Sequence, residues 1–327
     1  MKLVRSVGRR LRRPFLTRGA ILLYHRVADL ELDPQLLSVT PAHFDEHLQV
    51  LRKLALPRTL AQIAHHTEAG AVAVTFDDGY EDNLLNAAPA LARNGVPATF
   101  FITSGVLGKN REFFWDDLER LLLGPHPLPA SFSLEIAGER IEMVLEGTPH
   151  DPRWTVLRPD LSARTLLYRR LHRALGPLPG SERRAVLERI AAWAGAGVEA
   201  RQTHRMLTNN QLANLSGLPG VEIGAHSVTH PVLSSLPPEE QRGEIAQSKA
   251  VLEEIVARPV ESFAYPFGSE DDYGPVAVAA VRDAGFRRAA STTHDTVWRG
   301  SDRFRLPRIL VRDCDGEAFA RLLHQYL

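Results

Sequence analysis

Short apolar runs alternate with amphipathic stretches along most of the chain, and this alternation limits the folds open to it. The run "AVAVTF" (71–76), for example, is followed by a stretch of helical periodicity that ends at Gly95. Strand–helix–strand order with short connections predicts parallel strands joined by helical crossovers. About seven predicted strands favour a barrel-like α/β fold over an open sheet. The predicted strands lie at 20–25, 71–76, 97–103, 221–226, 260–268, 286–292 and 304–311, and the predicted helices at 42–54, 83–95, 237–257, 276–286 and 316–327.

The alternation lapses between Gly105 and about Arg205. Helical patterns occupy 113–124, 163–175 and 181–195, and 130–147 reads as a hairpin with its turn at "AGER". We therefore predict a mainly helical insertion of about a hundred residues, at about 106–205, between two strands of the barrel. The predicted organisation is a basic arm at 1–19 and a barrel at 20–327 that this insertion interrupts.

Composition narrows the classes of partner and compartment. The 327 residues carry no formal net charge, so no general attraction to nucleic acid is expected. A single cysteine, Cys314, excludes an intrachain disulfide and fits a reducing compartment. We find neither a secretory signal nor the run of roughly 20 apolar residues that a membrane span needs, and expect a cytoplasmic protein. The basic residues of 1–19 form either a solvated arm or a peripheral contact with the anionic inner face of the membrane.

Two polar motifs follow predicted strands far apart in the sequence. "TFDDG" places Asp77 and Asp78 side by side after an apolar strand, and "HSVTH" places His226 and His230 four residues apart. On a helical turn, two imidazoles at that spacing share a face and can hold one metal ion. A carboxylate would complete a set of three ligands with a position left open, the pattern of hydrolytic metal sites. Both motifs sit at the carboxyl ends of predicted parallel strands, where α/β folds place their sites.

These motifs carry a family resemblance. "TFDDGYEDN", "HSVTHP" and "AYPFG" resemble, in order, three motifs of the polysaccharide deacetylases, the NodB-homology group of carbohydrate esterase family four. The resemblance covers about Ala20–Gly105 and Leu207–Arg312, and "LLYHRV" and "LPRI" are similar to signatures of bacterial members that serve exopolysaccharide synthesis. It implies a distorted barrel of about seven β/α units that removes N-acetyl groups from sugars with the help of a metal.

The resemblance also implies roles for individual residues. Asp78, His226 and His230 match the metal ligands, with zinc the expected ion, although nitrogen and oxygen ligands also admit cobalt, nickel or iron. Asp77 matches the catalytic base, which takes a proton from the attacking water. Residues expected to contact the substrate or the oxyanion are Phe267 through its backbone N–H, Tyr265 and Arg308.

Two departures from the family pattern leave alternatives open. The general acid that protonates the departing amine is assigned to His25, at the end of the first strand, with His294 as the alternative. Ala264 stands where the family's third motif has an arginine that orients the base. Arg308 is the expected substitute, because a charge within a predicted strand is costly unless it is paired, and Arg26 is the alternative.

The leading functional hypothesis is a metal-dependent N-deacetylase acting on an N-acetylated sugar, glycan or lipid-linked polysaccharide precursor. A hydrolase of small non-sugar amides on the same barrel is one alternative. A non-catalytic glycan-binding module is another, prompted by the missing arginine and the unsettled acid.

Overall fold

The computed structural model describes residues 18–327 apart from 66–67, 148–150 and 161, so most of the predicted basic arm lies outside the described residues. Its centre is a nine-stranded sheet in the order β11-β10-β9-β6-β5-β1-β12, with β13 paired to β1 and β4 paired to β5. Neighbouring strands run parallel except at the β1–β12 edge. The strands are β1 (Arg18–Tyr24), β4 (Leu56–Pro57), β5 (Ala71–Phe76), β6 (Ala98–Ile102), β9 (Val221–Ala225), β10 (Ser262–Ala264), β11 (Arg288–Ala290), β12 (Val297–Trp298) and β13 (Ile309–Leu310).

A single segment, 306–311, joins the two ends of this curled sheet. Leu306 bridges to Ala290 beside β11, while β13 pairs with β1 and Val311 donates a 2.9 Å hydrogen bond to the carbonyl of Leu23. The predicted α/β barrel is therefore confirmed, in a distorted form. The predicted strand at 304–311 was too long, because Pro307 has no N–H to give to a ladder.

The predicted strand at 260–268 is likewise shorter than expected. Only β10 is extended, because Pro266 follows it and the chain then turns through two residues in the left-handed region, Phe267 and Gly268. The strands at the centre behave as predicted: all six residues of β5 are buried, which explains its continuous apolar run.

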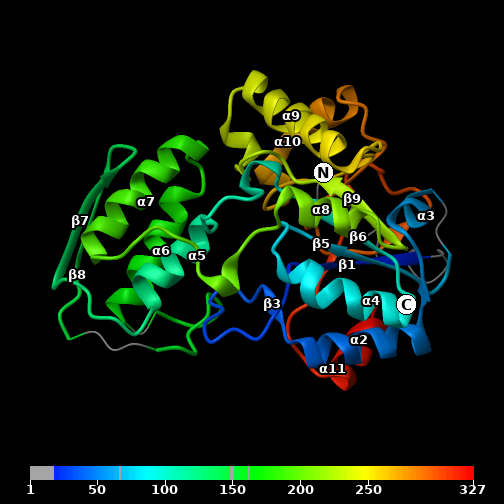
Figure 1. Ribbon diagram of the computed structural model, residues 1–327, viewed down its shortest axis with the longest axis horizontal. Helices are drawn as coiled ribbons and strands as arrows, with labels where there is room; N and C mark the ends of the chain where they lie inside the picture. Colours follow the sequence, from blue (N-terminus) through cyan, green and yellow to red (C-terminus); the bar gives the residue numbers. More distant parts are fainter. Residues whose placement is uncertain (1–17, 66–67, 148–150, 161) are drawn as a thin grey trace, which may run out of the picture.

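Helices cover the sheet on the outside (Figure 1). The helices around the barrel are α2 (Pro41–Leu54), α3 (Leu60–His65), α4 (Ala88–Asn94), α8 (Asn209–Ser216), α9 (Pro238–Val256), α10 (Glu270–Asp283) and α11 (Gly316–His324), with short π or 3-10 turns η2 (Asn83–Ala87), η3 (Ser104–Val106), η5 (Gln202–His204) and η6 (Leu233–Ser235). The rings of Tyr24, Phe76 and Phe100 stack across three adjacent strands, and Phe44 of α2 meets the first two edge-on. This aromatic layer fixes the strands from which the polar site emerges.

The predicted insertion forms the lobe on the left of Figure 1. Its elements are α5 (Phe114–Leu118), the π turn η4 (Glu119–Leu123), the strands β7 (Ser131–Ile136) and β8 (Glu139–Val144), and the helices α6 (Ala163–Leu175) and α7 (Gly180–Ala194). The two strands pair as an antiparallel hairpin around Ala137 and Gly138. The buried apolar residues of this lobe form a cluster separate from that of the barrel. We retain the division at about 106–205 as a proposal. A further pair, β2 (Arg26–Val27) with β3 (Ser38–Val39), lies between the lobes.

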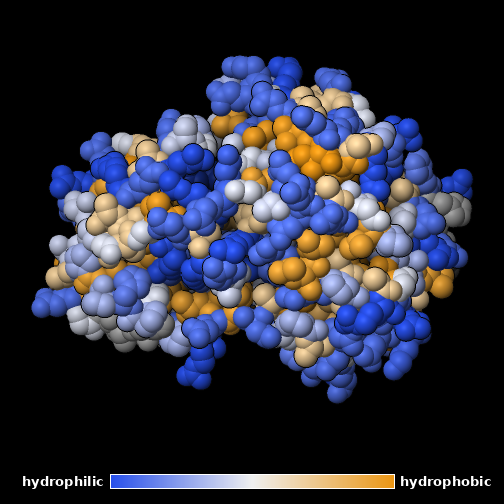
Figure 2. Space-filling view, in the orientation of Figure 1, coloured by the Kyte–Doolittle hydropathy of each residue, from blue (hydrophilic) through white to orange (hydrophobic). Residues whose placement is uncertain are grey.

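Within the described residues, no helix combines the length and the apolar character that crossing a bilayer requires. The face drawn in Figure 2 is mostly hydrophilic, with separate hydrophobic patches, one of them near α9 and α10. Neither observation tests the compartment expected from the sequence.

The chain reverses direction directly after β5. Asp78 has a φ of 77° and Gly79 a φ of 92°, and the N–H of Thr103 reaches the carbonyl of Asp78 at 3.2 Å. A Cβ at position 79 would lie 3.2 Å from Cδ1 of Ile102. Both the backbone conformation and the space therefore call for glycine here.

Gly79→Ala should lower the free energy of unfolding by about 1–2 kcal/mol more than Gly95→Ala. The matched control at Gly95 has a φ of 63° but open space around its Cα, so alanine there meets only the backbone cost, whereas at position 79 it also overpacks Ile102. Urea unfolding of both variants measures the difference. Equal losses would show that the packing at Gly79 is unimportant.

Candidate active site

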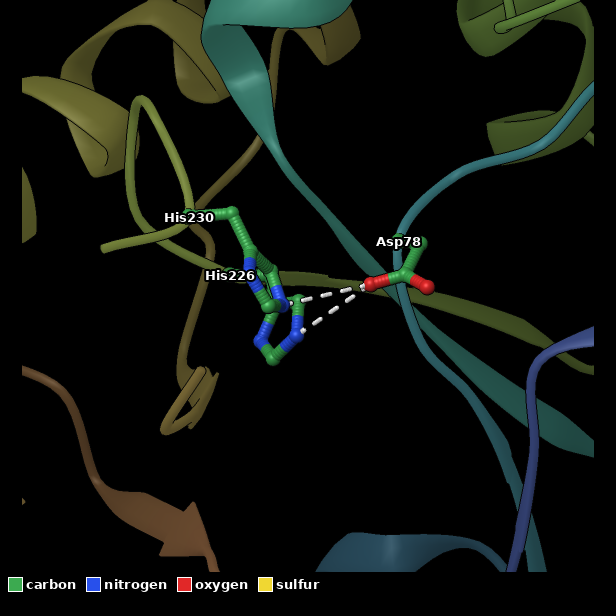
Figure 3. Close-up of side chains that lie close together, drawn as sticks. All are labelled: Asp78, His226 and His230. Atoms are coloured by element: carbon green, nitrogen blue, oxygen red, sulfur yellow. Dashed lines mark ion pairs between the residues drawn. The ribbon is translucent and has the colours of Figure 1, made fainter. Parts of the chain in front are cut away.

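Three buried side chains converge on one point at the carboxyl ends of β5 and β9. Nε2 of His226 lies 3.6 Å and Nε2 of His230 lies 3.4 Å from the same carboxylate oxygen, Oδ1 of Asp78 (Figure 3). The three donor atoms lie within 4.8 Å of one another. One carboxylate oxygen and two imidazole nitrogens form a donor set typical of zinc and of other divalent transition metals.

The loop that carries the two histidines is irregular and forms no helical turn. β9 ends just before His226, and the chain then passes through Ser227 (φ 63°) and His230 (φ 54°), both in the left-handed region. The carboxylate of Glu244 on α9 accepts two backbone N–H groups from the middle of the loop, each at 2.8 Å. The four-residue spacing is correct, but a braced irregular turn produces the convergence.

Burial decides the charge states of the three donors. Burial, together with the charge of Asp77, raises the pKa of Asp78 well above its ordinary value. Burial lowers the pKa of both imidazoles, so His226 and His230 are neutral near pH 7 with lone pairs available. A divalent cation would offset the two adjacent carboxylate charges, so these residues fit a metal ion.

Asp77 points to a different partner. Arg308, just before β13, donates a bidentate pair of hydrogen bonds to it, Nη1 to Oδ1 and Nη2 to Oδ2, each 2.7 Å. Both side chains are buried. Burial alone would raise the pKa of Asp77, but the charge and hydrogen bonds of Arg308, together with the nearby imidazoles of His226 and His25, hold the pKa below its usual range.

Arg308 thus holds Asp77 as expected of the arginine that the family's third motif would supply. In this chain Ala264 stands at that motif position. The alternative, Arg26, lies elsewhere: its Nε donates to Asp82 at 3.0 Å, and its guanidinium lies 4.2 Å from the ring centroid of Tyr80.

A cavity of about 370 Å³ opens onto these groups. Both aspartates and both histidines line it, as do Phe267, with a φ of 58°, and His25. The Nδ1 atom of His25 is buried and has no hydrogen-bond partner among the described residues. Burial lowers the pKa of His25 to about 4. Two further lining side chains, Trp115 and His172, come from the predicted insertion.

Two of the residues proposed from the sequence lie away from this cavity. The hydroxyl of Tyr265 donates to the carbonyl of Phe304 at 3.0 Å, and its ring stacks on Tyr273 in the core. Tyr265 follows β10, and its side chain is fully buried in the core, so it does not contact a substrate in the cavity. His294 lines a separate pocket with Cys314 and shares a hydrogen bond with the hydroxyl of Tyr326.

The sequence did not reveal a second buried polar cluster beside the site. Asp116, in the first turn of α5, is buried and accepts a 2.7 Å hydrogen bond from the hydroxyl of Tyr80. It lies with Glu119 and His204 in an arrangement that resembles a metal site. However, Nη1 of Arg201 already lies 2.6 Å from Glu119, so a guanidinium supplies the positive charge there. The adjacent acids after aromatic residues in "FFWDD" are the only sequence signal of this cluster.

A family model described as polysaccharide deacetylase matches residues 64–128 and 201–289 and leaves 129–200 unmatched. No curated protein sequence matches the chain significantly.

Solved structures of similar fold come from several bacteria. The deacetylase PplD of Streptococcus pyogenes, in complex with acetate, aligns with 16% identity and a TM-score of 0.58 over 94% of this chain and 98% of its own. IcaB of Ammonifex degensii aligns with 16% identity and a TM-score of 0.58, over 93% of this chain and 96% of its own. The BpsB deacetylase domain of Bordetella bronchiseptica aligns with 14% identity and a TM-score of 0.52, over 90% of this chain and 96% of its own. At these identities the likeness establishes the fold.

Arg308→Leu should lower the free energy of unfolding at pH 7 by about 3–5 kcal/mol, because it leaves a buried carboxylate unpaired. The folded pKa of Asp77 is depressed in the wild type, so the contribution of the pair is present above the unfolded pKa of about 3.9 and is lost as the pH falls through the folded value. The deficit of the variant should therefore shrink below pH 4. Urea unfolding of metal-free protein at pH 7 and below pH 4 measures this, and a deficit that does not change with pH would contradict the assignment.

Proposed function

Since the chain belongs to the polysaccharide deacetylase family, we propose that it is a metal-dependent hydrolase that removes N-acetyl groups from an N-acetylated sugar, glycan or lipid-linked polysaccharide precursor. The observation that carries the proposal is that the two adjacent carboxylates have different partners. Asp78 faces two imidazoles, while Arg308 pairs with Asp77 and keeps it ionised.

Asp78, His226 and His230 would hold the metal, with zinc as the proposed ion. A bound divalent cation would supply Lewis-acid chemistry, polarising the acetyl carbonyl and making water more acidic. The three residues leave one side of the site open to the cavity, where a substrate can enter.

Asp77 would act as the general base. Its depressed pKa keeps it unprotonated at neutral pH, and both of its oxygens are oriented by the rigid fork of Arg308. The carboxylate can therefore accept the proton of a water molecule as that water attacks the acetyl carbon.

His25 would return a proton to the departing amine, which cannot leave as an amide anion. With a pKa of about 4, its imidazole is neutral at rest and has no proton to spare. The charge of Asp77 acts on His25, and protonated Asp77 is the natural source of the proton. The proton taken from water would pass from Asp77 through His25 to nitrogen, which balances the reaction without an external acid.

Cavity size supports the second candidate, a hydrolase of small non-sugar amides. The volume of about 370 Å³ is at the lower end of the range for small-molecule sites, roughly 300–1,000 Å³. An aromatic wall that includes Trp115 and Phe267 suits a sugar ring equally well, so we retain the sugar as the leading substrate.

Zinc-loaded protein should release free amine from N-acetylglucosamine oligomers, and chelation should stop the release. Asp77→Asn should lower kcat by roughly 10²–10⁴-fold with zinc still bound, because it removes the base without removing a ligand. Amine release and metal content, measured on the same samples, test this expectation. Activity retained in Asp77→Asn would exclude Asp77 as the base.

His25→Gln should also lower kcat, by roughly 10²-fold or more, without changing zinc affinity. His294→Gln is the matched control, because that histidine lies in a different pocket, and it should retain wild-type activity. The reverse outcome would move the proton donor to His294.

A further inference from the structure

The two histidines of the proposed metal centre are held in different ways. Histidines that bind metals usually donate the N–H of their second ring nitrogen to a fixed acceptor, which orients the ring. His226 follows this rule, since its Nδ1 lies 2.8 Å from the carbonyl of Ala264. In the described part of the chain, Nδ1 of His230 is buried and has no such partner. No acceptor on another described residue therefore fixes this ring, and the position of His230 depends on how its backbone is held.

The backbone of His230 takes over this role. Its N–H donates to Oγ of Ser227 at 3.1 Å, and its carbonyl accepts from Nη1 of Arg183 at 3.3 Å. The φ of 54° is uncommon for a residue with a Cβ and persists only where the surroundings enforce it. The aromatic rings around the imidazole belong to Phe113, Trp115 and Phe267.

Arg183 belongs to α7 of the insertion, and its surroundings are unusual for a charged side chain. It is 6% exposed, and within the described residues it donates hydrogen bonds to four backbone carbonyls. Besides His230, the acceptors are Leu175 at 3.1 Å, Gly176 at 2.9 Å and Leu178 at 2.9 Å. Burial lowers its pKa to about 10, so the guanidinium remains charged at neutral pH. One buried cation therefore ties the α6–α7 connection to the loop of the metal centre.

The start of α7 also packs directly on that loop. A Cβ at Gly180 would lie 3.1 Å from Cβ of Thr229, the residue before His230. Close packing and the arginine thus act on the same short segment, from the same element of the insertion.

We infer that Arg183 is a positioning residue of the metal centre, through which the insertion sets the affinity of the barrel for its metal. The inference rests on the proposed function, because it takes His230 as a ligand. It gives the insertion a role in assembling the site, beyond lining the cavity.

Cobalt binding tests the inference without an activity assay. Co²⁺ titrated into metal-free protein reports affinity and ligand geometry through its visible absorption. Arg183→Leu should bind Co²⁺ roughly 10–100-fold more weakly than wild type, as found when partners of metal ligands are removed. The Co²⁺ affinity of Arg183→Lys should lie between those of wild type and Arg183→Leu, because a single ammonium group cannot reach all four carbonyls. This variant tests the inference if Arg183→Leu does not fold.

Arg164→Leu is the matched control. Arg164 is another buried arginine of the insertion. It donates to the backbone carbonyls of Gly124 and His126, both at 2.9 Å. Neither residue belongs to the loop that carries His226 and His230. Urea unfolding of the metal-free variants should show a loss of stability for Arg164→Leu, while its Co²⁺ affinity stays at the wild-type level.

The outcomes separate the inference from the proposed function. Wild-type Co²⁺ affinity in both Arg183 variants would overturn the inference alone. Equal weakening in Arg164→Leu would also overturn it, since general destabilisation would then be the cause. Failure of the wild-type chain to bind Co²⁺ would overturn both the inference and the proposed function.

Discussion

The buried pair between Asp77 and Arg308 is the interaction on which both the site and the barrel depend. Asp77 follows the central strand β5, and Arg308 lies in the segment that joins the two ends of the sheet. The pair therefore stabilises the closure of the barrel and, at the same time, fixes the charge of the proposed base. Removing the arginine would leave a buried carboxylate without its counter-charge.

Much of the fold followed from the sequence because its signals are local. The apolar run of β5 and the periodicity of α2, α6 and α9 each reflect burial of a strand or of one helix face. The segments predicted as strands at 260–268 and 304–311 were too long, since an apolar pattern does not show where a proline removes a hydrogen bond. The polar residues of the site were recognised because Asp77, Asp78, His226 and His230 stand in short motifs at strand ends.

What the sequence could not provide is set by contacts between distant segments. The positive φ at Ser227 and His230 leaves no trace in the four-residue spacing, so the sequence could not show that an irregular loop brings the two imidazoles together. Asp116 lies in the first turn of α5, but its burial leaves no local signal, because its partner, the hydroxyl of Tyr80, lies 36 residues away in sequence. Arg308 was one of two possibilities, and only the packing of the closing segment distinguishes it from Arg26.

The closure of the barrel by 306–311 has a consequence for folding. Asp77 and Arg308 are 231 residues apart in sequence, so their contact closes a very long loop of the chain. Contacts of such long range are slow to form, because loop-closure entropy is lost before the contact can compensate for it. Partly folded chains in which this contact has not formed would keep Asp77 without its counter-charge. Closure of the sheet by 306–311 and pairing of the proposed base with its counter-charge would thus be one event in folding.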